Sequence, residues 1–311
     1  LYYLDNQADW YSFFYLFKTP IFSLIYIGLF IMEVILLTRF FQKSVKRGNY
    51  SIYSSTYLKK WFLDQLFSLS LTVIKPLFAT IYISSLYRAM GAKVGNNTEI
   101  STATNVTHAL FEIGDESFIA DDVSLGETEI RNQELTLDYT RIGNKSFVGN
   151  SALIPQGYTF GHGMLIGVIS LPPTESQLAD VTNKDWFGSP PRAIPKREMN
   201  FDYPAELTYN PTQKRKLFRG IVEFLRILIP QSVILSVSII FIAYTDDLLQ
   251  EKRWHEIMFY FPIYYLLMVA IPCFVFTLIF KWLIVGQYKE SQFPMWTWHV
   301  WKTEAVTSIY E

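Results

Sequence analysis

Residues 142–171 read IGNKSF VGNSAL IPQGYT FGHGML IGVISL and repeat with a period of six. An aliphatic or aromatic residue heads each hexad, and the next residue is Gly or Pro. The hexad heads are Ile142, Val148, Ile154, Phe160 and Ile166. A helix has a period of 3.6 residues and a strand a period of two, so the pattern fits neither. It is typical of a left-handed parallel β-helix, whose triangular coils take about three hexads each, and we predict that fold with the heads pointing inward.

The same period extends toward the N-terminus through two further sets of hexad heads, Val94, Ile100, Val106 and Ile113, Ile119, Leu125. Residues 127–141, ETEIRNQELTLDYTR, break the register. We expect them to leave the prism as a loop or hairpin that helps to wall a substrate cleft. The Pro-rich segment after residue 171 contains Trp186 and is expected to pack across the last coil. The predicted β-helix domain, with this exit, covers residues 91–200.

The composition indicates a membrane protein that carries one soluble module. Half of the 311 residues are hydrophobic, only 18% are charged, and the apolar residues come in blocks. The single cysteine, Cys273, excludes an intrachain disulfide and a cysteine-based zinc site. A formal net charge of -1 and the lack of an arginine-rich face argue against nucleic-acid binding.

Three apolar blocks, at 20–38, 227–243 and 257–280, are predicted to lie in the bilayer, the last two as a transmembrane hairpin. The loop at 39–60 carries six Lys or Arg and no acid, so we expect it in the cytoplasm, with the β-helix on that side. Residues 61–90 are also apolar, but they contain Asp64 and a Lys75-Pro76 step. Proline breaks the helical hydrogen-bond ladder, so two short interfacial or re-entrant helices are predicted there.

An internal repeat links the predicted helical domains at 1–90 and 201–311. Trp10, an apolar helix and an aromatic-rich stretch near residue 50 correspond to Trp254, an apolar helix and the stretch near Phe293. The second copy would begin a further domain like the first.

Several motifs together resemble one family. They are AMGAKVGNNTEIST, IGDESFIADDVSLG, TRIGNKSFVGNSALIPQG, LIGVISLPP, DWFGSPP and GQYKESQFPMWTWHVWKTE. The chain is similar over nearly its whole length to the membrane-embedded C-terminal region of ε-poly-L-lysine synthetases and related nonribosomal-peptide-synthetase-like proteins. The resemblance implies a transferase that makes an amide (peptide) bond from an acyl or aminoacyl thioester. The donor would be carried by phosphopantetheine on a carrier domain or by CoA, with no metal, and the chain itself has no adenylation or carrier domain.

Transfer from a thioester to an amine needs a general base and donors for the oxyanion. His162 follows Gly161 at a coil corner, and His108 sits where the hexad spacing stretches from six to seven, so both are candidate catalytic bases. A solvated corner histidine is the competing interpretation of His162. The acids Glu112, Asp115, Asp121 and Asp122 either orient a histidine and bind an amine or simply solvate turns.

The candidate substrate contacts are Asp115, Trp186, Asn150 and Ser151. The last two are expected either to bind a pantetheine amide or to form a ladder inside the prism. Besides the thioester substrate and the bilayer, a second β-helix domain or a homologous subunit is an expected partner. Two other functions stay open: a noncatalytic β-helix scaffold supporting a second, active one, and a γ-class carbonic anhydrase. The latter needs three histidine ligands where the prism offers two.

Overall fold

The computed structural model describes residues 17–174, 176–177, 184–196, 203–250, 254–288 and 290–310. Two units make up the chain, one of residues 1–29 with 214–311 and the other of residues 30–213. They are described in turn, beginning with the second.

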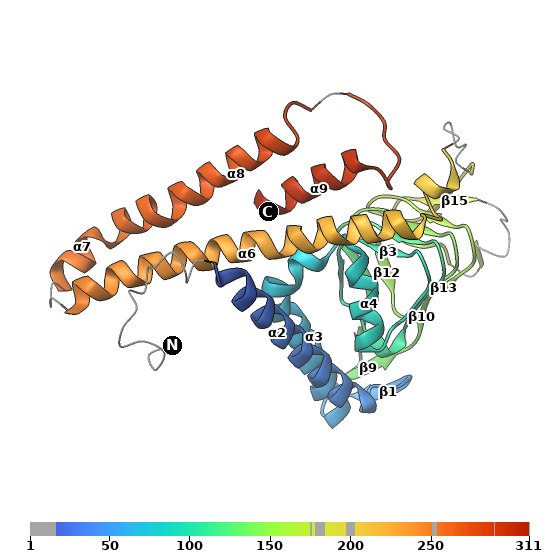
Figure 1. Ribbon diagram of the computed structural model, residues 1–311. Helices are drawn as coiled ribbons and strands as arrows, with labels where there is room; N and C mark the ends of the chain where they lie inside the picture. Colours follow the sequence, from blue (N-terminus) through green and yellow to red (C-terminus); the bar gives the residue numbers. More distant parts are fainter. Residues whose placement is uncertain are drawn as a thin grey trace. The chain divides into compact units, whose positions relative to one another are not determined.

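Three sheets of short strands form most of residues 93–194, and their strands are parallel except for the last strand of the second sheet, Arg192–Ile194. The first sheet contains β2 (Lys93–Val94), β5 (Phe111–Ile113), β10 (Thr140–Ile142) and β13 (Thr159–Phe160). The second contains β3 (Glu99–Ile100), β6 (Phe118–Ile119), β11 (Phe147–Val148), β14 (Leu165–Ile166), β15 (Asp185–Phe187) and β16 (Arg192–Ile194). The third contains β4 (Ala103–Thr104), β7 (Val123–Glu127) and β12 (Leu153–Pro155). Each circuit of the chain visits the sheets in this order, and Figure 1 shows the strands stacked.

The hexad heads form the interior of these circuits. Ile100, Ile119, Val148, Ile154 and Ile166 are all 0% exposed. Heads of successive circuits pair directly, since Ile142 lies beside Ile113 and Val148 beside Ile119 in parallel register. Full burial of such a side chain contributes about 1.5–3 kcal/mol. The predicted six-residue register therefore corresponds to rows of inward-facing heads, of which Val94 at the edge is partly buried; the side chain of Phe160 lies outside the described residues.

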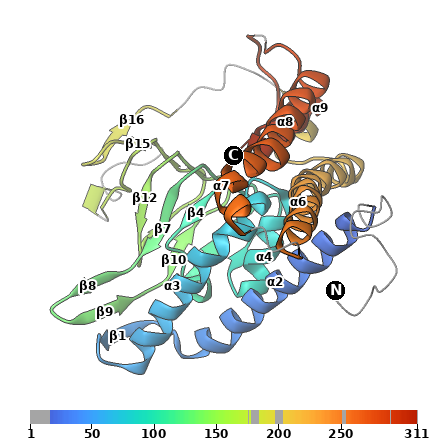
Figure 2. The same cartoon turned by 90° about the vertical axis from the view of Figure 1, so that its left-hand side faces the viewer.

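The segment that breaks the register forms a hairpin of β8 (Glu129–Arg131) and β9 (Glu134–Leu137), as predicted. The hairpin does not stand free. β9 pairs antiparallel with β1 (Gly48–Ser51), and Figure 2 shows the hairpin beside that strand. Leu135 and Leu137 are 1% exposed in a small core that also contains Val45 and Leu110. The hairpin thus connects the sheets to residues 45–51 through strand pairing and apolar contacts.

The described helices of this unit that lie before the sheets are α2 (Thr19–Phe41), of which the later part belongs to it, α3 (Ser55–Ile74) and α4 (Ile81–Met90). Ser54 and Thr80 cap α3 and α4, because their side chains accept a backbone N–H of the first turn. A 3-10 turn at Lys75–Leu77 separates the two helices, which confirms the break predicted at Lys75-Pro76. Only α2 of these is long and apolar enough to cross a membrane.

The other unit contains α6 (Gln213–Gln250), α7 (Trp254–Tyr265), a π-helical turn (Leu266–Ala270), α8 (Ile271–Ile284) and α9 (Trp298–Tyr310). Candidate membrane spans lie at 213–242 and 261–284, so each predicted apolar block coincides with a helix that could span. Near the start of α6, the buried guanidinium of Arg219 lies 2.6 Å from the Glu223 carboxylate and over the Trp296 ring. This pairing explains how a charged side chain is accommodated there.

The helix boundaries agree with the proposed repeat. α3 begins the same number of residues after the end of α2 as α9 begins after the end of α8. No strand matching β1 is present among the described residues between α8 and α9. Trp10, which anchors the sequence alignment of the repeat, lies outside the described residues.

Candidate functional site: one corner of the coil and one buried junction

His162 lies at a corner where every circuit places a turn in the same register. The corner residue follows a Gly and is Asn96, Asp115, Asn144 or His162. The residue after it has a left-handed backbone, with φ between 54° and 67° at Asn97, Glu116, Lys145 and Gly163. A regular turn of this kind stacks equivalent side chains one above another.

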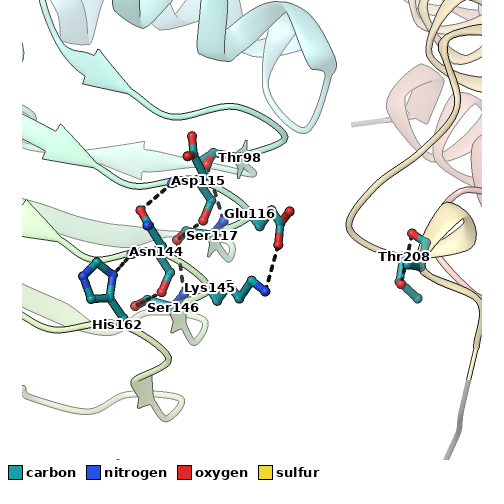
Figure 3. A network of polar contacts seen from close by, with 10 residues as sticks. Thr98, Asp115, Glu116, Ser117, Asn144, Lys145, Ser146, His162 and Thr208 are labelled. Carbon is teal, nitrogen blue, oxygen red and sulfur yellow. Dashed lines mark hydrogen bonds and ion pairs between the residues drawn. The ribbon is translucent and has the colours of Figure 1, made fainter.

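The stacked corner side chains form a hydrogen-bonded ladder (Figure 3). The backbone N–H of Asn96 donates to Asp115 Oδ1 at 2.6 Å. The N–H of Asp115 donates to Asn144 Oδ1 at 2.9 Å, and the N–H of Asn144 donates to His162 Nδ1 at 3.0 Å. Each side chain therefore satisfies a backbone donor of the preceding circuit. His162 is the third rung of this ladder.

The ladder determines which nitrogen of the neutral His162 ring carries the hydrogen. A neutral imidazole has one nitrogen that accepts and one that donates. Since Nδ1 accepts from Asn144, Nε2 carries the hydrogen. The side chain is exposed, so the corner presents an N–H donor to the outside. A donor of this kind can stabilise an oxyanion, whereas the predicted general base would need a free lone pair at Nε2.

Close stacking requires a glycine at this corner in every described circuit except the last. A Cβ on Gly143 would lie 2.5 Å from the carbonyl carbon of Gly161 and 2.8 Å from the backbone nitrogen of His162. A Cβ on Gly161 would meet no heavy atom of the described residues within 4 Å. The last described circuit is therefore the one with room for a side chain.

The structure places His108 elsewhere, in a buried junction between helices and sheets. Its ring packs edge-to-face on Phe67 of α3 and Tyr87 of α4, with centroids 5.1 and 4.9 Å away. Burial, and secondarily the charge of Lys60, lowers its pKa from the ordinary 6.5 to about 3. Burial likewise raises the pKa of Tyr87. His108 is thus held neutral and away from solvent, which is not the setting of a base matched to neutral pH.

The other predicted contacts divide between surface and interior. Asn150 and Ser151 are exposed at the next corner, where Ser151 has φ 53°. The Asn150 side chain therefore forms no ladder inside the prism; Asn144 supplies a ladder rung on the outer corner instead. Trp186 is only 2% exposed, in a strand that pairs with Ile166, so it closes the last circuit.

The acidic candidates have mainly structural contacts. Glu112 accepts from Lys93 and Arg141 on the neighbouring strands, and the Lys93 hydrogen bond is the main reason that its pKa is lowered. Asp121 accepts a hydrogen bond from the Ser101 hydroxyl, and Asp122 sits at φ 56° in a turn. Within the described ranges, no three His, Cys, Asp or Glu side chains group as metal ligands.

Sequence reasoning missed Asn144, Lys60 and Asp64. Asn144 could have been found by aligning the hexads, because it occupies the position of Asp115 and His162. Lys60 and Asp64 are four residues apart on α3, which permits an ion pair. Their Nζ–Oδ1 distance is 2.5 Å, and the Lys60 side chain is 5% exposed. No feature of the sequence indicated that this pair would line the same cavity as His108.

Comparison with known proteins finds no matching family model. The chain is 41% identical over 264 residues to the delta-poly-L-ornithine synthetase of Acinetobacter baumannii (strain AB307-0294). The match covers 85% of this chain and 20% of that protein, so the chain spans about a fifth of its relative's length. It is thus similar to a synthetase of a poly-amino acid, as expected, although of ornithine rather than lysine.

Solved structures with local likeness include two acetyltransferases. A maltose O-acetyltransferase from Clostridium difficile 630 has a TM-score of 0.35 at 16% identity, covering 51% of this chain and 97% of that one. A galactoside acetyltransferase in complex with coenzyme A has a TM-score of 0.32 at 22% identity, covering 53% and 92%.

Proposed function

We propose that this chain is a membrane-anchored aminoacyl or acyl transferase region that forms an amide bond from a thioester, within a larger synthetase of poly-amino-acid type. The observation that carries the proposal is the 41% identity to a poly-ornithine synthetase across 85% of the chain. Poly-amino-acid synthesis requires repeated amide formation. The exposed N–H donor at the corner of the stacked sheets suits amide formation, because it could stabilise the negative charge on the reacting carbonyl oxygen.

We infer that the three sheets are the walls of a left-handed parallel β-helix, occupying residues 91–200 between the helical regions 1–90 and 201–311. Support comes from parallel pairing in all three sheets and from the fixed order in which the chain visits them. The buried hexad heads give it a continuous core. The 201–311 region, with its matching helix spacing, would begin a second repeat.

The chemistry is a substitution at the thioester carbonyl. The amine nitrogen forms a bond to the carbonyl carbon, the C–S bond breaks, the thiol leaves, and the amine proton passes to the sulfur. Negative charge develops on the carbonyl oxygen before the C–S bond breaks. The Nε2–H of His162 is suited to donate to that oxygen. Asp115, one turn residue of the same ladder, would attract the amine, and Asn150 and Ser151 would contact the pantetheine amides.

The thioester donor would be either a phosphopantetheine arm on a carrier domain or CoA. Both present the same thiol and pantetheine amides, so the proposed contacts do not distinguish them. His108 and Trp186 are given no substrate contact in this proposal, since both side chains are buried.

Purified chain in nanodiscs should be incubated with ornithyl and lysyl thioesters of pantetheine and of CoA, together with a diamino-acid acceptor. Mass spectrometry then measures the amide product. His162→Asn keeps an oxygen that accepts from the Asn144 N–H, as Asn144 does for Asp115, but it removes the Nε2–H. We expect amide formation to fall roughly 100-fold in this variant. Glu129→Gln, on the exposed hairpin, is the matched control and should retain wild-type turnover.

Two outcomes would contradict different parts of the proposal. If wild-type chain forms no amide from any of the four thioesters, amide transfer by this region fails. The noncatalytic scaffold would then be favoured. If wild-type chain is active and His162→Asn is equally active, His162 is only a structural rung and the residue assignment fails while the function stands.

The membrane part of the proposal is that α2, α6 and α7–α8 span the bilayer, that α3 contacts lipid and that the sheets lie on the cytoplasmic side. The basic loop after α2 supports that side. On α3 the charged pair Lys60–Asp64 points inward, whereas Leu58, Trp61 and Leu69 are 50–75% exposed. Gln65, Ser68 and Thr72 of α3 are exposed as well, so its outer face mixes large apolar and uncharged polar side chains, which suits a helix at the bilayer interface.

Spin labels can test the α3 face, because Cys273→Ser leaves a chain without cysteine. Labels at positions 58, 61 and 69 should be relaxed by oxygen more than by a water-soluble nickel complex. A label at Glu129 should show the opposite preference. Nickel accessibility at all three α3 positions would contradict the lipid contact.

A further inference from the structure

A cavity of about 20 Å³ lies at the junction where His108 is buried. Its walls come from the end of α2, the 3-10 turn after it (Gln42–Ser44), α3, Met90 and the turn at 106–109. Five of the lining side chains are polar and at least nine-tenths buried: Thr38, Gln42, Lys60, Thr107 and His108. Helices α2 and α3 and the first circuit of the sheets therefore meet around one small polar space.

Three atoms of this lining have no hydrogen-bond partner among the described residues: Gln42 Oε1, Thr107 Oγ1 and His108 Nε2. Lys60 Nζ is bonded to Asp64 Oδ1, and an ammonium has three N–H donors, so it can also serve a second acceptor. Buried polar groups in folded proteins are almost always hydrogen-bonded. Their gathering around one cavity indicates a shared partner there.

The size and charge of the cavity limit what that partner can be. A water molecule needs at least about 10–15 Å³ and two to four polar partners, whereas an organic ligand needs far more space. A metal cation would lie beside the Lys60 ammonium with a single carboxylate, Asp64, to offset the charge. Water alone matches both the volume and the mixture of donors and acceptors.

We infer that this cavity binds one ordered water, which accepts from Lys60 and Thr107 and donates to Gln42 Oε1 and His108 Nε2. With Lys60 and Thr107 as donors, the two water hydrogens are available for the two acceptors. His108 then has its hydrogen on Nδ1, the tautomer opposite to that of His162. The water joins the helical segments to the first circuit, so His108 is a positioning residue of the fold at this junction.

The two tautomers give a direct test that does not depend on any enzymatic activity. The full chain, labelled with ¹⁵N and ¹³C only in histidine, should show four ring systems by NMR. His108→Phe and His162→Asn identify two of them by their disappearance. We expect an acceptor-type Nε2 shift for His108, a protonated Nε2 for His162, and a cross-peak between water and the His108 ring.

A second measurement keeps the inference testable if His108→Phe does not fold. Thr107→Val removes the hydroxyl at constant shape, and Thr107→Ser retains it. We expect Thr107→Val to lower the Tm by about 2–4 °C and Thr107→Ser to lower it by less than half as much. A crystal under xenon pressure should show no xenon in the cavity, because xenon enters dry apolar cavities.

The inference is overturned by xenon density in the cavity, or by a protonated His108 Nε2 without a water cross-peak. Equal Tm values for wild type and Thr107→Val would also contradict it. If His108→Phe does not fold, the His108 ring signals can be identified with Gln42→Met, which should change their chemical shifts without removing them.

Discussion

The corner that carries His162 and the junction that carries His108 are built from the same hexad-repeat sequence, yet they hold their histidines in opposite ways. At the corner, His162 repeats the hydrogen bond that Asn144 and Asp115 make one and two circuits earlier, and its ring is exposed. At the junction, the spacing stretches by one residue, a 3-10 turn (His108–Leu110) forms, and the ring turns inward against Phe67 and Tyr87. Where the six-residue register is regular, a side chain makes the same hydrogen bond as the equivalent side chains in other circuits. Where the spacing changes, as before Ile113, the side chain has different neighbours.

Filling the space beside Gly143 at the regular corner should have the largest effect on the free energy of unfolding. Gly143→Ala places a Cβ 2.5 Å from the Gly161 backbone, so we expect a loss of about 3 kcal/mol in the free energy of unfolding. Gly161→Ala, one circuit later, meets open space and should change it by less than about 0.5 kcal/mol. Thermal unfolding of the two variants measures the difference. Equal effects would show that the stacking of circuits is not as close as described.

The buried histidine should make stability depend on pH. Because the pKa of His108 is about 3 in the folded chain and 6.5 in its ordinary state, only the unfolded chain takes up this proton between those values. The stability contributed by neutral His108 is therefore full above pH 6.5 and is lost as the pH falls, by about 1.4 kcal/mol per unit.

His108→Phe should remove this slope between pH 6.5 and 5, measured as the change of Tm with pH. Lys60 and Asp64 line the same cavity and the Tyr87 ring packs on His108, and none of these three residues has an ordinary pKa in this window. Glu129→Gln, on the exposed hairpin, serves as the control and should keep the wild-type slope. A wild-type slope in His108→Phe would mean that another group carries the pH dependence.

The smallest effect is expected at the exposed rung itself. His162→Ala leaves the Asn144 N–H without its acceptor, and we expect a loss of about 1 kcal/mol, whereas His162→Asn should recover most of it. Chemical or thermal unfolding in the same detergent compares the two. If Ala and Asn are equivalent, solvent replaces the rung and the ladder does not stabilise the corner.

Much of the fold followed from the sequence alone. The buried heads, the ejected hairpin, the helix break at Lys75-Pro76 and the three apolar helices were all predictable. These features depend on periodicity, on proline and on composition, which act over a few residues and are visible in the chain. The candidate site was less accessible. The sequence indicated two histidines, but it contained nothing about the ring nitrogen that each would present.

The sequence by itself determined where the turns of the coil fall, because apolar heads recur every six residues and a Gly or Pro follows each of the five heads in residues 142–171. Only the tertiary structure decided what lies opposite each side chain. The Asn144 nitrogen lies 3.0 Å from His162 Nδ1 because their two circuits stack, and Lys60 lies near His108 because α3 packs beside the first circuit. Hydrogen-bond partners and dielectric surroundings come from residues distant in sequence, and they determine whether an imidazole donates, accepts or stays buried and neutral.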